Sequence, residues 1–281
     1  MRLRHYYSFV LFVILLSPVF SQPPRNIVYR SNSSAGKAEN RENTSFKNNL
    51  VWSFGGKQQR GWQLYLPLIA QFIGTDETAE SENFSKDLAQ WQSLSGLPTH
   101  GVLDQETWLK LVEKWQVRRS KDRTIPPPEK LVIVSASEFY DPERPVELRQ
   151  LETETYRAYK KMIAAAAKDL NLPLDADGKI AASEKSLKII SAFRSPEYQQ
   201  KLRAQSPNAG RAGLAINSPH FTGRALDIYV GGDPVSTKDA NRMIQVNSKA
   251  YRWLVKNAGQ FGFIPYFYEP WHWEYNPQAV K

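Results

Sequence analysis

Several residue types that define other classes of protein are missing or scarce in this chain. It has no cysteine, which excludes disulfide bonds and attachment to a lipid through an N-terminal cysteine. Beyond one stretch near the N-terminus it has no long apolar run, so the sequence predicts no further membrane span. Only four of its 281 residues are histidine, and histidines that are grouped with acidic residues therefore point to a shared chemical role.

The N-terminus has the three parts of an export signal. Arg2 and Arg4 supply positive charge, Tyr6–Leu16 is almost wholly apolar, and Val19–Ser21 resembles a cleavage site with a small last residue. We expect residues 1–21 to be removed as a signal peptide and the protein to be exported, with no stable membrane span afterwards. The alternative is an uncleaved anchor, although the apolar run is well short of the roughly 20 residues of a membrane helix.

Length and local composition predict two folded units joined by connectors. Residues 22–48 are rich in Ser, Asn, Lys and Glu, which predicts a flexible linker. Residues 49–117 form a first domain in this prediction. Residues 118–129 combine a charged run with three consecutive prolines, which favours an extended linker. The second domain is predicted over 130–281.

The chemistry-bearing residues gather in the second domain. Ser218–Asp227 reads SPHFTGRALD and Glu269–His272 reads EPWH. A catalytic zinc ion is usually held by three nitrogen or carboxylate ligands and keeps a fourth position for water. His220, Asp227 and His272 supply such a set, and Glu269 remains available as a general base.

These two motifs, together with SAFRSPEYQ at Ser191–Gln199, resemble the VanY-type D-alanyl-D-alanine carboxypeptidases, a branch of the LAS metallopeptidases. The resemblance implies a Zn²⁺ cofactor and peptidoglycan stem peptides as substrates and partners. It also implies that Arg194 stabilises the developing oxyanion or binds the substrate's terminal carboxylate, and that Gln199 and Ser218 contact substrate. It further implies a location in the periplasm or outside the cell, associated with the cell wall.

Local patterns suggest how the predicted ligands could meet. Arg224–Val230 alternates as a strand does, which puts Asp227 on one face and its apolar neighbours on the other. Gly223 gives the chain the freedom to turn between His220 and this strand. Pro270 predicts an edge or a bulge at which the chain bends, so that Glu269 and His272 can converge.

The order of the remaining elements predicts an α+β fold, in which helices pack on a small, mainly antiparallel sheet of the LAS or hedgehog type. The resemblance and the apolar patterns agree on this architecture. The predicted elements are a helix over 146–170, a strand over 187–192, a helix over 196–205, a strand over 224–230, a helical stripe over 251–261 and a strand over 263–275.

The first domain is predicted to be small and all-helical, because Leu88–Leu111 resembles the second half of a peptidoglycan-binding helical repeat. Leu88, Trp91 and Leu94 recur at helical spacing, and Asp104 is placed to cap the next helix. Its aromatic residues fit a core as well as a binding face, so a purely structural module remains an alternative.

The net charge of +9 and the isoelectric point near 9.5 suit a protein that approaches an anionic wall polymer. We expect no nucleic-acid partner, because the basic residues are scattered and no nucleic-acid motif is present.

Three functions stay open at this point. The leading one is a zinc D,D-carboxypeptidase that removes a terminal D-alanine from stem peptides. The second is an endopeptidase that uses the same metal site on an internal bond. The third is a noncatalytic wall-binding protein, against which stands the presence of all three predicted ligands together with Glu269. Each candidate residue also has an ordinary structural alternative, such as an ion pair for Arg194 or a turn for Ser218.

Overall fold

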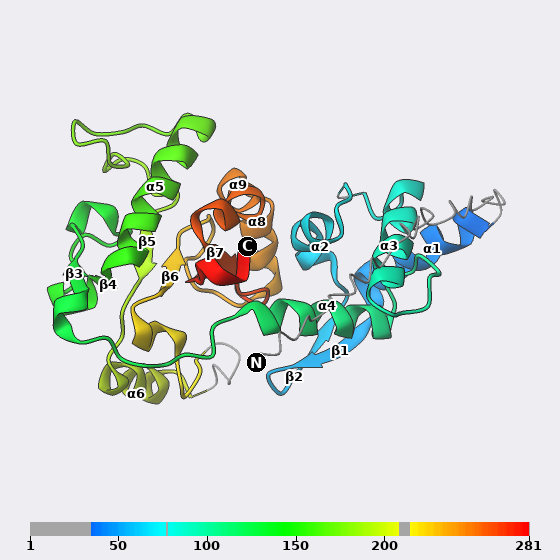
Figure 1. Cartoon of the computed structure of the whole chain (residues 1–281), viewed down its shortest axis with the longest axis horizontal. Coiled ribbons are helices and arrows are strands. Elements are labelled where there is room, and N and C mark those ends of the chain that lie inside the picture. Colours follow the sequence, from blue (N-terminus) through cyan, green and yellow to red (C-terminus); the bar gives the residue numbers. More distant parts are fainter. Residues whose placement is uncertain (1–34, 77, 208–213, 281) are drawn as a thin grey trace, which may run out of the picture.

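The structure, a computed structural model, describes residues 35–76, 78–207 and 214–280. The predicted signal peptide and the first part of the predicted linker lie outside these residues. A largely helical N-terminal part and a C-terminal part built around a sheet lie side by side along the long axis of the molecule (Figure 1). Among the described residues, no helix is both long and apolar enough to cross a membrane.

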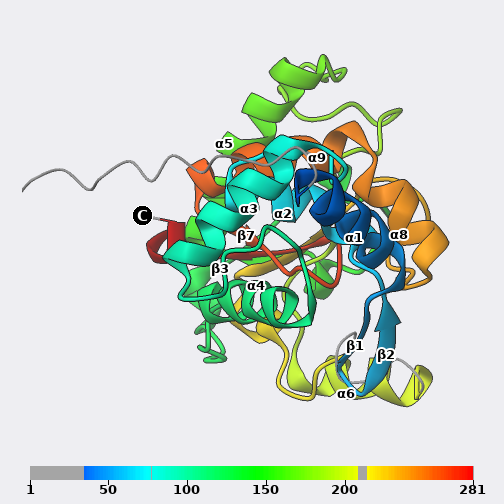
Figure 2. The same cartoon turned by 90° about the vertical axis from the view of Figure 1, so that its right-hand side faces the viewer.

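The N-terminal part is not all-helical as predicted, because it contains an antiparallel hairpin between its first two helices (Figure 2). Its elements are α1 (Ala35–Asn49), β1 (Val51–Phe54), β2 (Lys57–Arg60), α2 (Leu66–Ile73), α3 (Glu82–Leu94) and α4 (Gln105–Arg118). Helix α1 replaces the described end of the predicted flexible linker. The fully buried Asn43 explains why: its side-chain amide donates to Gly101 O at 2.9 Å, and its side-chain oxygen accepts from Leu103 N at 2.8 Å. Residues 35–48 are therefore part of the folded unit.

Helices α3 and α4 begin where their caps predict. The side chain of Ser81 accepts from Phe84 N, and that of Asp104 accepts from Thr107 N at 2.9 Å. The predicted apolar stripe is only partly correct, since Leu88 is fully buried while Leu94 is 82% exposed.

The C-terminal part contains a four-stranded antiparallel sheet in the order β5-β6-β8-β7. Its strands are β5 (Ile189–Ser191), β6 (Ala225–Ile228), β7 (Phe263–Pro265) and β8 (His272–Tyr275). A separate pair is formed by β3 (Leu131–Ile133) and β4 (Gln150–Glu152), and the helices are α5 (Thr153–Leu170), α6 (Pro196–Gln205), α8 (Asp239–Val246) and α9 (Lys249–Asn257). Mixed helices and small antiparallel sheets agree with the predicted α+β class.

Two predicted elements are divided in the structure. The helix predicted over 146–170 begins only at Thr153, because Gln150–Glu152 pairs with β3. The strand predicted over 263–275 is a hairpin, in which Tyr266–Trp271 connects β7 to β8. This connection carries Glu269, so the turn itself places a candidate catalytic residue.

One aromatic cluster joins the two parts of the molecule. Phe267, in the β7–β8 connection, is 2% exposed and packs against rings of the N-terminal part. Its ring centroid lies 4.8 Å from that of Phe54, 5.6 Å from that of Tyr65 and 5.6 Å from that of Trp115. The hairpin β1–β2 and helix α4 therefore hold the connection that carries Glu269.

Gly223 has a positive φ of 66° and lies between the helical turn of His220 and β6, where a Cβ atom would come within 2.9 Å of Glu152 N. Gly96 has a similar φ of 71° but open space around it. We predict that Gly96→Ala costs about 1 kcal/mol of unfolding free energy and Gly223→Ala about 2–4 kcal/mol, because only the latter adds a backbone clash. Urea unfolding of both variants measures this difference, and equal losses would contradict it.

Candidate metal and catalytic site

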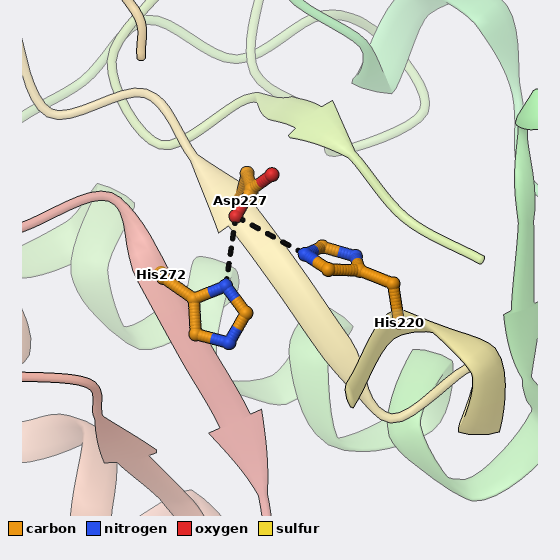
Figure 3. Close-up of side chains that lie close together, drawn as sticks. All are labelled: His220, Asp227 and His272. Atoms are coloured by element: carbon orange, nitrogen blue, oxygen red, sulfur yellow. Dashed lines mark hydrogen bonds and ion pairs between the residues drawn. The ribbon is translucent and has the colours of Figure 1, made fainter. Parts of the chain in front are cut away.

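The three predicted metal ligands converge although they come from distant parts of the chain (Figure 3). One ligand atom from each of His220, Asp227 and His272 lies within 4.8 Å of the other two. Asp227 in β6 is paired directly with His272 in β8, which puts both side chains on the same face of the sheet. His220 belongs to the short 3-10 helix Pro219–Thr222, and the left-handed Gly223 turns the chain back toward β6.

Asp227 is the centre of this cluster. Its Oδ1 atom lies 3.3 Å from His220 Nε2 and 3.0 Å from His272 Nδ1, while its Oδ2 accepts from Arg194 Nη2 at 2.5 Å. Burial favours the neutral carboxyl, but the interactions of Asp227 with His220 and with the positive charge of Arg194 outweigh it and hold the pKa of Asp227 well below its usual value. The carboxylate is therefore charged at neutral pH.

The environment of His220 fits a cation at this place. Its Nδ1 atom lies 2.7 Å from Ala192 O, which can only accept, so Nδ1 carries the proton and Nε2 presents a lone pair toward Asp227. Burial, assisted by the charge of Arg194, lowers the pKa of His220 to about 4 and keeps the ring neutral. Two acceptor atoms 3.3 Å apart repel each other unless a cation lies between them. The nitrogen, oxygen and nitrogen donors suit Zn²⁺.

His272 lies between two carboxylates. Its Nδ1 faces Asp227, and its Nε2 lies 3.3 Å from Glu274 Oε1. Burial opposes its charge, but the hydrogen bonds to these two carboxylates outweigh burial and raise the pKa of His272 to about 9. With Nδ1 turned toward the cluster, Glu274 can accept the other ring proton, which is how carboxylates commonly orient metal-binding imidazoles.

Glu274 and its partner Arg119 were not among the sequence-predicted site residues. Arg119 donates from Nε to Glu274 Oε1 at 2.7 Å, and its guanidinium lies over the Tyr266 ring at 3.9 Å from the centroid. Glu274 is two residues beyond His272 in one strand, so the two-residue period of a strand could have indicated it. Arg119 belongs to the predicted linker, and no local pattern connects it with this site.

Glu269 lies on the same cleft as the three candidate ligands. His272 N donates to Glu269 O at 3.0 Å, which closes a β-turn with Pro270 at its second position. A turn, rather than the predicted edge or bulge, therefore brings Glu269 and His272 together. Burial raises the pKa of Glu269 to about 8 although the charge of His272 opposes this.

The three predicted substrate-contacting residues differ in their placement. Arg194 and Ser218 line the cleft, and the Ser218 hydroxyl also accepts from His220 N at 3.3 Å. Gln199 is 2% exposed; it accepts from Arg194 at 3.3 Å and donates to Ala215 O at 2.8 Å. The structure thus places Gln199 behind Arg194, away from the cleft wall.

The cleft around these residues has a volume of about 430 Å³. Four arginines of the described residues line it: Arg119, Arg123, Arg144 and Arg194. Apolar side chains, among them Leu202, Leu214 and Trp271, form other parts of its wall. The cleft suits an anionic ligand that also has small apolar groups.

Comparison with known families agrees with this site. Residues 148–278 match the VanY family of D-alanyl-D-alanine carboxypeptidases. The matched region is just under half of the chain and includes Arg194, Ser218, Glu269 and the three candidate ligands. It suggests a peptidase of the D-alanyl-D-alanine carboxypeptidase type. No curated protein matches the chain.

The N-terminal part lies outside the VanY match, and so does the segment that follows it, which carries Arg119 and Arg144. The peptidoglycan-binding character predicted for residues 49–117 therefore stays a prediction.

The pKa values of the VanY-like site predict how the metal-free protein responds to pH. His272 has a folded-state pKa raised to about 9, so its stabilisation is complete below pH 6.5 and is lost as the pH rises through 9. Glu269, raised to about 8, changes stability in the same direction. We predict that chelator-treated protein loses about 4 kcal/mol of unfolding free energy between pH 6.5 and pH 9, because both groups contribute in this range, and urea unfolding measures the loss.

His272→Asn should reduce this loss, whereas His100→Asn, a change in the loop before α4, should leave it intact. A metal-free protein whose stability stays flat or rises over this range would contradict the assigned environment of His272.

The contact between Glu274 and His272 predicts an effect on metal affinity. We expect Glu274→Gln to weaken Zn²⁺ binding about 10- to 100-fold, because the imidazole loses the carboxylate that orients it. Competition with a chromophoric chelator measures the dissociation constant. Glu154→Gln is a matched control, since Glu154 also pairs with an arginine, Arg157, but at an exposed position on α5. Equal affinities of the two variants would exclude the orienting role.

Proposed function

We propose that this protein is an exported, zinc-dependent D,D-carboxypeptidase that removes the terminal D-alanine from peptidoglycan stem peptides. One observation carries the proposal: the cluster of His220, Asp227 and His272 shares a cleft with the buried carboxyl group of Glu269, inside the region that matches the VanY family. Three metal-binding side chains and a separate carboxylate are the parts that metal-assisted amide hydrolysis requires.

His220, Asp227 and His272 would hold the zinc ion, which when bound supplies a water whose pKa is lowered toward about 7. The positive charge of a bound zinc ion would favour the ionised form of Glu269, against the burial that raises its pKa in the metal-free protein. This carboxylate would accept a proton from the attacking water as the new bond to the carbonyl carbon forms. The carbon–nitrogen bond then breaks, and Glu269 returns the proton to the leaving amine. The products are the shortened peptide acid and free alanine.

In this proposal Arg194 orients the Asp227 carboxylate, and its positive charge stabilises the transition state. Its guanidinium donates to Asp227, and its side chain is only 11% exposed. A permanent positive charge next to the cleft stabilises negative charge that develops on the carbonyl oxygen. Ser218 holds the turn of His220 through its hydroxyl group and lines the cleft beside it.

The charge of the whole chain supports a wall substrate. A formal net charge of +9 and a cleft lined by arginines favour approach to an anionic polymer and binding of peptides that carry free carboxylates. The N-terminal part braces the Glu269 connection through Phe267, and this structural role does not depend on any wall-binding activity of its own.

The test is mass spectrometry of pentapeptide-containing and cross-linked muropeptides after incubation with the purified protein, with and without a zinc chelator. We expect chelator-sensitive loss of one alanine from the pentapeptide. Glu269→Gln should keep its zinc and lower kcat about 10²- to 10⁴-fold, because the general base is removed. Glu197→Gln, an exposed glutamate at the start of α6, is the control and should retain activity.

Cleavage of internal bonds alone would reassign the protein as an endopeptidase of the same kind. Absence of any product from zinc-loaded protein would reject both peptidase assignments and favour a binding role.

A further inference from the structure

Two arginines on the cleft wall share one buried hydroxyl group. Ser191 Oγ accepts from Arg194 Nε at 2.9 Å and from Arg144 Nη2 at 3.4 Å. Ser191 is 4% exposed, at the end of β5, and both arginines line the cleft. Two guanidinium groups that meet at one oxygen repel each other, and an anion beside them relieves this repulsion.

Backbone contacts fix the segment that carries Arg144. Phe139 forms a parallel bridge with Ile189, and Tyr140 N donates to Ile189 O at 2.9 Å, which holds the segment against β5. Arg144 Nε then donates to Leu148 O at 3.3 Å. Its placement beside Ser191 therefore follows from the sheet, although Arg144 precedes the VanY match.

The two arginines differ in what their remaining donors contact. Each of the three guanidinium nitrogens of Arg194 donates to a neighbouring side chain, one of them the Asp227 carboxylate. Among the described residues, Arg144 donates only to Leu148 O and Ser191 Oγ, and no carboxylate lies within ion-pair distance of it. Burial, assisted by the charge of Arg194, lowers the pKa of Arg144. A half-buried guanidinium with free donors on a cleft wall is suited to a carboxylate.

We propose that Arg144 binds the C-terminal carboxylate of the substrate peptide and thereby makes the site select chain ends. This inference rests on the proposed function. The contacts from Arg144 through Ser191 and Arg194 to Asp227 connect the carboxylate subsite to the candidate metal ligands. Arg144 and the three candidate ligands line the same cleft, so a carboxylate at Arg144 and a peptide bond at the metal site can belong to one bound peptide.

The experiment measures binding in the absence of turnover. Zinc-loaded full-length Glu269→Gln protein is titrated calorimetrically with a blocked tripeptide that ends in D-alanyl-D-alanine, and with the C-terminal amide of the same peptide. We expect the acid to bind about 10- to 100-fold more tightly than the amide, because charge-assisted hydrogen bonds to Arg144 are lost with the carboxylate.

Adding Arg144→Gln should remove this preference, because it weakens binding of the peptide acid and leaves binding of the amide unchanged. Arg144→Lys should restore part of the preference, since lysine keeps the positive charge but lacks the paired N–H donors of the guanidinium group. Arg149→Gln is the matched control. Arg149 is half-buried in the same segment and donates to Val134 O, but it does not line the cleft. Arg149→Gln should leave the preference for the acid unchanged. Binding of the amide by every variant verifies that the site is folded.

Two outcomes would overturn the carboxylate subsite: equal binding of acid and amide before any change at Arg144, or an acid preference that survives Arg144→Gln. Neither outcome contradicts the proposed function. That function fails if the pentapeptide loses no alanine in the mass-spectrometry assay. Loss of alanine without an acid preference would keep the carboxypeptidase and reject the role of Arg144.

Discussion

The buried carboxylate of Asp227 is the interaction on which the site depends. A charged group that is 2% exposed is stable only when positive charge and hydrogen bonds surround it, and here it faces Arg194, His220 and His272. These partners come from different elements, so the same carboxylate ties the loop after β5, the short helix before β6 and strand β8 together. Replacing it would leave three cationic or polar groups buried without a partner, and the geometry of the cluster would be lost with it.

The N-terminal part contributes to the same geometry from outside. Phe267 inserts into its aromatic cluster and fixes the connection on which Glu269 lies, while Arg119 compensates the buried charge of Glu274 behind His272. Both contacts reach residues within or next to the turn that carries Glu269 and His272. The N-terminal part is therefore a structural component of the site, and this accounts for its extensive aromatic junction with the C-terminal part.

The sequence predicts those parts of the fold and site that depend on residues close together in the chain. His220, Asp227 and His272 lie in short motifs whose local patterns already indicate strands and turns, and the antiparallel β6–β8 pair brings them together. The hairpin β1–β2 is local, and its turn at Gly55 and Gly56, both with positive φ, is a signal that the predicted all-helical domain left out. Helix α1 and the contact of Arg119 with Glu274 depend on partners 42 and 155 residues away, and no local period marks them. The helix predicted from Val146 was shortened for the same reason, because pairing with β3 prevailed over helical periodicity. Gln199 shows the converse: it lies in a predicted site motif, but its buried side chain contacts Arg194 from behind and does not line the cleft.

The arginines of the cleft differ in how their charge is compensated by other protein groups. Arg119 is compensated by Glu274 and Arg194 by Asp227, while Arg123 donates to three backbone carbonyls, those of Ser120, Asp122 and Asn217. Each of these cations thus holds a protein group in place. Only Arg144, among the four, combines two weak neutral contacts with a position on the cleft wall. Because an uncompensated buried charge costs stability, a guanidinium in this state is explained more readily by a ligand that arrives with a carboxylate than by the folded chain alone.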